Sequence, residues 1–219
     1  MEETFSKEES LHLISKMINA AKKEQKDNGL GWIVWGWLLL ATSLLTVLDI
    51  HYKWFQLGFF WNVFGGIVLL YMLFAIIRSQ FFKKIVKVKT YTQDLLSKLN
   101  AGFFISLMFI IISMNVSNYL LYEKYTVYDI IPINTGFALL INLYAFWILI
   151  YGTALNFRPS VIGAYCTWAV GFTALFMKTF EQVMLLHALA VVVGYIIPGH
   201  IANSQFKKLH QKGNSTDGI

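Results

Sequence analysis

The sequence predicts an all-α membrane protein, in which six transmembrane helices follow an amphipathic helix on the cytoplasmic side. Two observations lead to this fold class. First, 57% of the 219 residues are hydrophobic and only 14% are charged, whereas about a quarter of the residues in a soluble domain carry charge. Second, six long stretches contain no Asp, Glu, Lys or Arg. A bilayer is therefore the medium in which so much apolar surface is stable.

The N-terminal segment, residues 1–29, is predicted to lie in the cytoplasm and to contain an amphipathic helix from about Lys7 to Lys26. Ser6 and Glu9 have the spacing of a capping box, in which each side chain bonds the backbone amide of the other residue. Apolar residues then recur every three or four positions, as expected for one helical face: Leu11, Ile14, Ile18 and Ala21. The Asn-Gly pair that follows is typical of a helix end.

The six uncharged stretches are 19 to 28 residues long, and a helix needs roughly 20 residues to cross the hydrocarbon layer. A charged side chain at the centre of such a helix costs about 2.5 to 3.5 kcal/mol, so a charge-free run identifies a span. The predicted spans cover residues 30–50, 55–77, 100–121, 130–152, 159–177 and 182–201. They form one transmembrane bundle at residues 30–202.

Helix-breaking residues fall near the ends of these spans. Pro132 lies at the start of the fourth span, Pro159 opens the fifth, and Pro198 closes or kinks the sixth. Residues 203–219 are predicted to form a polar cytoplasmic tail. The end of this tail, residues 213–218, has the composition of a disordered segment.

The positions of the basic residues indicate the orientation of the chain. Of the 18 Lys and Arg residues, fifteen lie in the N-terminus, the second and fourth loops and the C-terminus. Cytoplasmic loops of membrane proteins carry an excess of positive charge. We therefore expect a multi-pass protein of the inner cell membrane with both termini in the cytoplasm.

Several functional classes lack the residues that they need. The net charge of +6 flanks apolar spans instead of covering a water-facing domain, so nucleic acid is not an expected partner. The single cysteine, Cys166, leaves no pair for a disulfide within the chain or a CxxC motif. Gly-x-Ser-Gly, His-Glu-x-x-His and glycine-rich phosphate loops are absent from the sequence. We predict no catalytic residue, no metal ligand and no cofactor, and hence no enzyme.

Polar residues gather at one depth of the predicted bundle. Five of them, from four spans, are expected in the outer third of the membrane: Asn62, Asn115, Asn118, Asn134 and His187. Buried amides need hydrogen-bond partners, and a small outward-facing polar pocket would provide them. The alternative is that these side chains bond to neighbouring helices or to water among the lipid headgroups. Asp49, His51 and Glu181 are expected near the same face, but their spacing matches no recognised metal site.

Small residues recur at intervals of four in the last two spans: Gly163, Thr167 and Gly171, then Ala190 and Gly194. Residues of this size let helix backbones approach closely. The pattern predicts contact with a neighbouring helix of the same chain, and a homo-oligomer is the alternative.

A basic cluster follows the second span directly: Arg78, Lys83, Lys84, Lys87 and Lys89. Such a cluster attracts anionic headgroups, at about 1 kcal/mol for each basic residue near the surface. We expect it to help set the topology and to contact anionic lipid, with an acidic cytoplasmic protein as the alternative partner.

The motif Gly-Trp-Ile-Val-Trp-Gly-Trp opens the first span, and Ile-Ile-Pro-Gly-His closes the sixth. Together with the charged N-terminal segment, this organisation resembles that of uncharacterised small bacterial multi-span proteins. The resemblance concerns overall organisation and implies no activity or site residue. The function we expect is that of a non-enzymatic scaffold, sensor or regulatory subunit acting through its cytoplasmic surfaces. The alternative is a small-solute permease that uses the outer polar pocket.

Overall fold

The computed structural model describes residues 28–56, 58–81, 91–125 and 131–216, which form helices and the connections between them. The helices are α2 (Leu30–Tyr52), α3 (Phe59–Phe81), α4 (Tyr91–Tyr125), α5 (Ile131–Ala154), α6 (Arg158–Ala174), α7 (Phe180–Val191), the π-helix η1 (Val192–Ile196) and α8 (Ile197–Thr216). The prediction of an all-α fold is confirmed for this part of the chain. The predicted amphipathic helix at Lys7 to Lys26 lies outside the described residues.

Four helical segments are both long and apolar enough to cross a membrane: Leu30–Tyr52, Leu95–Ser117, Ile133–Ala154 and Phe180–Lys208. The second predicted span corresponds to α3, a helix of 23 residues that contains the apolar segment Phe59–Tyr71. The fifth corresponds to the 17-residue helix α6. The structure therefore supports a membrane protein with several spanning helices, while the count of six stays a prediction.

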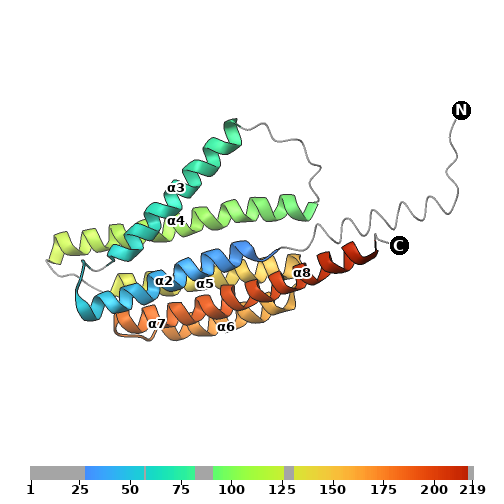
Figure 1. Cartoon of the computed structure of the whole chain (residues 1–219). Helices are drawn as coiled ribbons and strands as arrows, with labels where there is room; N and C mark the ends of the chain where they lie inside the picture. Colours follow the sequence, from blue (N-terminus) through green and yellow to red (C-terminus); the bar gives the residue numbers. More distant parts are fainter. Residues whose placement is uncertain (1–27, 57, 82–90, 126–130, 217–219) are drawn as a thin grey trace, which may run out of the picture.

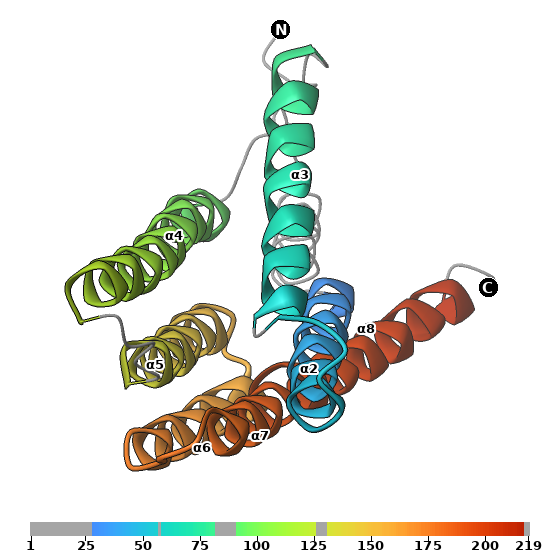
Figure 2. The same cartoon turned by 90° about the vertical axis from the view of Figure 1, so that its left-hand side faces the viewer.

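Helices α7 and η1 pack against α2, α5 and α6, and these helices run side by side (Figure 1). Helices α3 and α4 lie to one side of this group, and α3 projects away from it (Figure 2). In the described part of the chain, the backbone of α3 comes close to that of α2 alone, and the backbone of α4 to that of α5 alone. The described backbones of α3 and α4 therefore do not approach each other.

The bundle carries apolar side chains on both its inside and its outside. Ile141, Ile148 and Val183 are fully buried in the core, with 0% of their surface exposed. In contrast, Ile105 and Phe109 on α4 are 71% and 72% exposed. Exposed apolar surface of this kind is stable against lipid tails, which are as apolar as leucine.

The last long helix contains one π-helical turn, η1, after which the Ile197 N–H bonds the Val192 carbonyl five residues back. Pro198 follows directly. It has no N–H, and in a regular α-helix its ring would collide with the carbonyl four residues earlier. A wider turn before the proline relieves this collision. Pro198 therefore does not close the helix, which continues to Thr216. Residues 213–216, whose composition predicted disorder, belong to this helix.

The three glycines among the predicted packing residues all have close neighbours from other helices. A Cβ atom at Gly163 would be 2.9 Å from the Val193 carbonyl oxygen, and one at Gly171 would be 2.9 Å from a side-chain carbon of α5. A Cβ atom at Gly194 would be 2.7 Å from Oγ1 of Thr167. These faces of α6 and η1 are therefore occupied by helices of the same chain.

Candidate functional site

A cleft of about 490 Å³ lies between α3 and α4, and we call it the lateral cleft. Its lining comes from Gly58, from residues 61–69 on α3, residues 107–115 on α4 and residues 133–144 on α5, and from Phe180 of α7. In the described part of the chain the backbones of α3 and α4 do not approach each other, and the lateral cleft is partly open between them. Its volume is in the range of small-molecule sites, which span roughly 300 to 1,000 Å³.

The lining of the lateral cleft is mainly apolar and aromatic, with two amides. Asn62 lies in the first turn of α3 and Asn115 in the last third of α4. Both amides therefore lie toward the same end of the bundle. The Asn115 amide nitrogen donates to the Ile111 carbonyl of its own helix, at 2.8 Å. On α3, Gly65 and Gly66 leave open space, since a Cβ atom at either would have no neighbour within 4 Å. This combination suits a long apolar molecule with a polar end.

A buried histidine lies behind three aromatic side chains that line the lateral cleft, Trp61, Phe137 and Tyr144, which we call the aromatic wall. His187 of α7 has 0% of its surface exposed. Three rings surround its imidazole, with centroids at 5.1 Å for Trp61, 5.9 Å for Phe137 and 5.7 Å for Tyr144. All three rings also line the lateral cleft. One layer of aromatic side chains therefore separates the imidazole from the lateral cleft.

The five polar residues predicted to share a pocket do not all reach the lateral cleft. Asn62 and Asn115 line it, whereas Asn134 and His187 are buried in the packed interior. The side chain of Asn118 lies outside the described structure. Within the described part of the chain, the buried Asn134 Oδ1 and His187 Nε2 have no hydrogen-bond partner. The structure thus brings two of the five side chains into one cleft.

The aromatic side chains around His187 were not among the predicted site residues. Phe137 and Tyr144 are seven residues apart on α5, which places them on one helical face. That spacing was the available signal. It could not identify a site, because aromatic residues at helical spacing are also the usual content of a core, and Trp61 comes from a different helix.

The predicted packing residues are buried in the bundle, whereas only one residue of the basic cluster lies in the described part of the chain. The five predicted packing residues lie on faces of α6, α7 and η1 that pack within the bundle. All five are buried: Gly163, Thr167, Gly171, Ala190 and Gly194. In the basic cluster, Arg78 is exposed on α3, while Lys83, Lys84, Lys87 and Lys89 lie outside the described residues.

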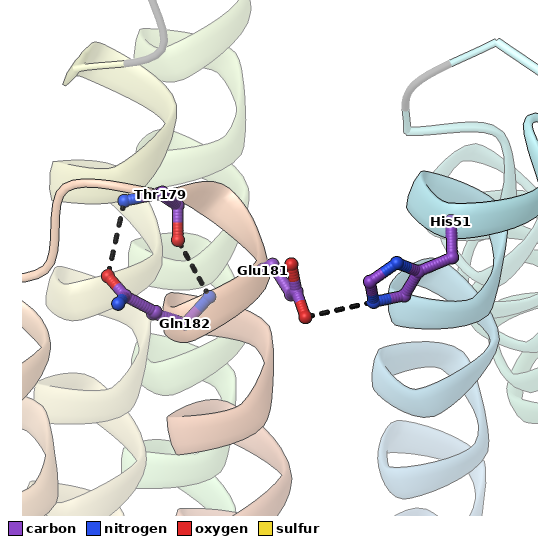
Figure 3. Close-up of polar contacts among 4 residues, drawn as sticks. All are labelled: His51, Thr179, Glu181 and Gln182. Atoms are coloured by element: carbon purple, nitrogen blue, oxygen red, sulfur yellow. Dashed lines mark hydrogen bonds and ion pairs between the residues drawn. The ribbon is translucent and has the colours of Figure 1, made fainter.

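Charged and polar groups connect α2 and α7 at the end of the bundle where α2 stops and α7 starts (Figure 3). His51 Nε2 and Glu181 Oε1 are 3.0 Å apart. Thr179 and Gln182 form a capping box at the start of α7. The Phe55 N–H donates to the buried Asp49 carboxylate at 2.8 Å. These residues organise the connection, and the described residues hold no cluster of three metal-binding side chains.

A smaller cavity of about 210 Å³ lies where α2 starts, α5 ends and α6 starts, with Trp32, Tyr151 and Pro198 among its lining residues. Ser160 also lines it, but its hydroxyl donates to the Ile148 carbonyl at 3.2 Å. The lateral cleft offers more volume and exposes both of its amides. It is therefore the stronger candidate for a binding site. No protein-family model, curated protein or solved structure matches this chain.

Proposed function

We propose that this chain is a non-enzymatic membrane protein that binds an amphipathic, lipid-like molecule in the lateral cleft and acts as a sensor or regulatory subunit. The observation that carries the proposal is the lateral cleft itself: among the described residues it is mainly apolar, partly open between α3 and α4, and has two amides nearer one end. A molecule that is already dissolved in the bilayer can enter such a cleft without crossing water. Its chain would replace lipid contacts on the lining, and its polar end would hydrogen-bond to the amides.

The proposed topology is that of an inner-membrane protein with six spans and both termini in the cytoplasm. The distribution of the 18 basic residues supports it. The shorter helix α6 packs closely on α5, and its 17 residues rise about 25 Å at 1.5 Å per residue. Most of the hydrocarbon thickness of roughly 30 Å is therefore covered by helix. The basic cluster that starts at Arg78 would then face anionic headgroups or an acidic cytoplasmic partner.

Reporter fusions that fluoresce only in the cytoplasm test this topology. A fusion after Asn156 should fluoresce because the chain has returned to the cytoplasm, and a fusion after Lys178 should stay dark because α6 has crossed. Full-length fusions at either terminus should fluoresce. Equal fluorescence after Asn156 and Lys178 would mean that α6 does not cross, and the six-span topology would be wrong.

Photolabelling tests the binding function. A photoreactive derivative of octadecanol should label the lining of the lateral cleft, for example near Leu69 and Met108, more strongly than the lipid-facing Ile105 and Phe109. Excess unmodified octadecanol should suppress the labelling in the lateral cleft, because a defined site is saturable. Labelling that is uniform over both groups and insensitive to competitor would contradict the proposal.

A small-solute permease is the second candidate, and the placement of Asn62 and Asn115 in one cleft favours it. Amides can orient a polar solute without a fixed charge. This function requires uptake of a polar solute into proteoliposomes, reduced by Asn62→Ala. The amphiphile-binding function requires no such uptake, so the transport assay separates the two candidates.

A further inference from the structure

The hydrogen bonds of His187 define which of its nitrogens is available. The Ser43 hydroxyl donates its single hydrogen to the Leu39 carbonyl, at 2.9 Å. Ser43 Oγ is also 2.8 Å from His187 Nδ1. With the hydroxyl hydrogen directed at the Leu39 carbonyl, the tautomer that satisfies both contacts has Nδ1 as the donor to Ser43 Oγ. In the neutral imidazole, Nε2 is then an acceptor with a free lone pair.

Within the described part of the chain, no group hydrogen-bonds to Nε2. Buried polar atoms in folded proteins nearly always have a partner, so one without a partner calls for an explanation. The three rings packed on the imidazole, from Trp61, Phe137 and Tyr144, are the same rings that line the lateral cleft. The unpartnered acceptor Nε2 and the lateral cleft therefore lie on either side of the same three rings.

Trp61 is the ring best placed to move. It comes from α3, whose backbone, in the described part of the chain, lies close only to that of α2. Its indole N–H donates to the thioether sulfur of Met184, at 3.2 Å, and a thioether is a weak acceptor. Phe137 and Tyr144, in contrast, are buried on α5 in the core of the bundle. A shift of Trp61 would thus cost little hydrogen bonding.

We propose that Nε2 of His187 accepts a hydrogen bond from the head group of the molecule in the lateral cleft, and that Trp61 covers this acceptor when the lateral cleft is unoccupied. The preferred ligand is then an amphiphile whose head group carries an O–H or N–H donor, such as a long-chain alcohol. This inference rests on the proposed function, since it names the head group that the lateral cleft selects. Ser43 is a positioning residue, because it holds the imidazole with Nε2 as the acceptor.

Two matched probes test the inference: octadecanol and its methyl ether, which has the same chain but no donor. Binding of each tritiated probe is measured on the full chain in lipid nanodiscs. The wild type should bind the alcohol roughly two- to tenfold more tightly, the usual contribution of one neutral hydrogen bond. In His187→Asn the ratio should fall to about one, because asparagine can still donate to Ser43 but has no atom at the Nε2 position.

The outcomes separate this inference from the proposed function. Saturable and equal binding of the two probes to the wild type would overturn the role of His187 and leave the lateral cleft as a binding site. A preference for alcohol that persists in folded His187→Asn would also overturn it. If neither probe binds saturably, the proposed function fails, and this inference fails with it.

A second measurement needs no variant. With ¹⁵N-labelled histidine, the resonance of the unprotonated Nε2 of His187 should shift when octadecanol is added and stay in place with the ether. An unchanged resonance at saturating alcohol would overturn the inference even if His187→Asn does not fold.

Discussion

Leucine at both Gly65 and Gly66 is expected to reduce octadecanol binding at least tenfold while the protein still folds. Both residues line the lateral cleft, and a Cβ atom at either position has no neighbour within 4 Å. The new side chains should therefore extend into the lateral cleft without disturbing the packed core. Leucine also favours helix over glycine by roughly 0.5 to 1 kcal/mol, so α3 should not be destabilised. Binding of tritiated octadecanol in nanodiscs measures the effect.

Gly102→Leu is the matched control. Gly102 also lies in an apolar helix, and a Cβ atom added there would likewise have no neighbour within 4 Å, but this residue is on α4 and does not line the lateral cleft. This variant should bind octadecanol like the wild type. An equal loss in both variants would mean that added apolar bulk alone weakens binding. Unchanged binding in the double variant would show that the ligand does not occupy the lateral cleft.

Gly163→Leu is expected to cause the largest loss of stability, about 3 kcal/mol or more, at the upper end for overpacking in a core. The atom nearest to the added Cβ is the Val193 carbonyl oxygen at 2.9 Å, followed by a ring carbon of Pro198 at 3.3 Å. Neither a backbone carbonyl nor a proline ring can rotate out of the way. Helix α6 would have to separate from η1. Thermal unfolding in mild detergent should show a lower midpoint and a smaller folded fraction.

Gly171→Leu gives a graded comparison, because the nearest atom there belongs to the side chain of Ile141, at 2.9 Å. A side chain can change rotamer, so the loss should be smaller than for Gly163→Leu. Gly102→Leu should cause no loss. If Gly163→Leu unfolds at the wild-type midpoint, the close approach of α6 to η1 does not exist in the folded protein.

The extent of the apolar helices could be predicted because charge is excluded from the membrane at a cost of several kcal/mol, which depends on residue type and position alone. The first predicted span, 30–50, corresponds to α2 at Leu30–Tyr52, and the fourth, 130–152, to α5 at Ile131–Ala154. The path through Pro198 could not be predicted in the same way. Proline removes one backbone hydrogen bond, but whether a helix then stops or widens depends on what packs beside it, which here includes Gly163.

The sequence by itself determined the medium of this protein, its all-helical fold and the approximate limits of its helices, because these follow from local hydrophobicity and the energy of burying charge. Only the tertiary structure decided which polar groups meet. Ser43 and His187 are 144 positions apart and touch because α2 packs on α7. Asn62 and Asn115 share a cleft because α3 and α4 stand apart. Lipid tails accept any apolar helix face, so hydrophobicity cannot select neighbours, and the choice falls to close packing and hydrogen bonds between helices.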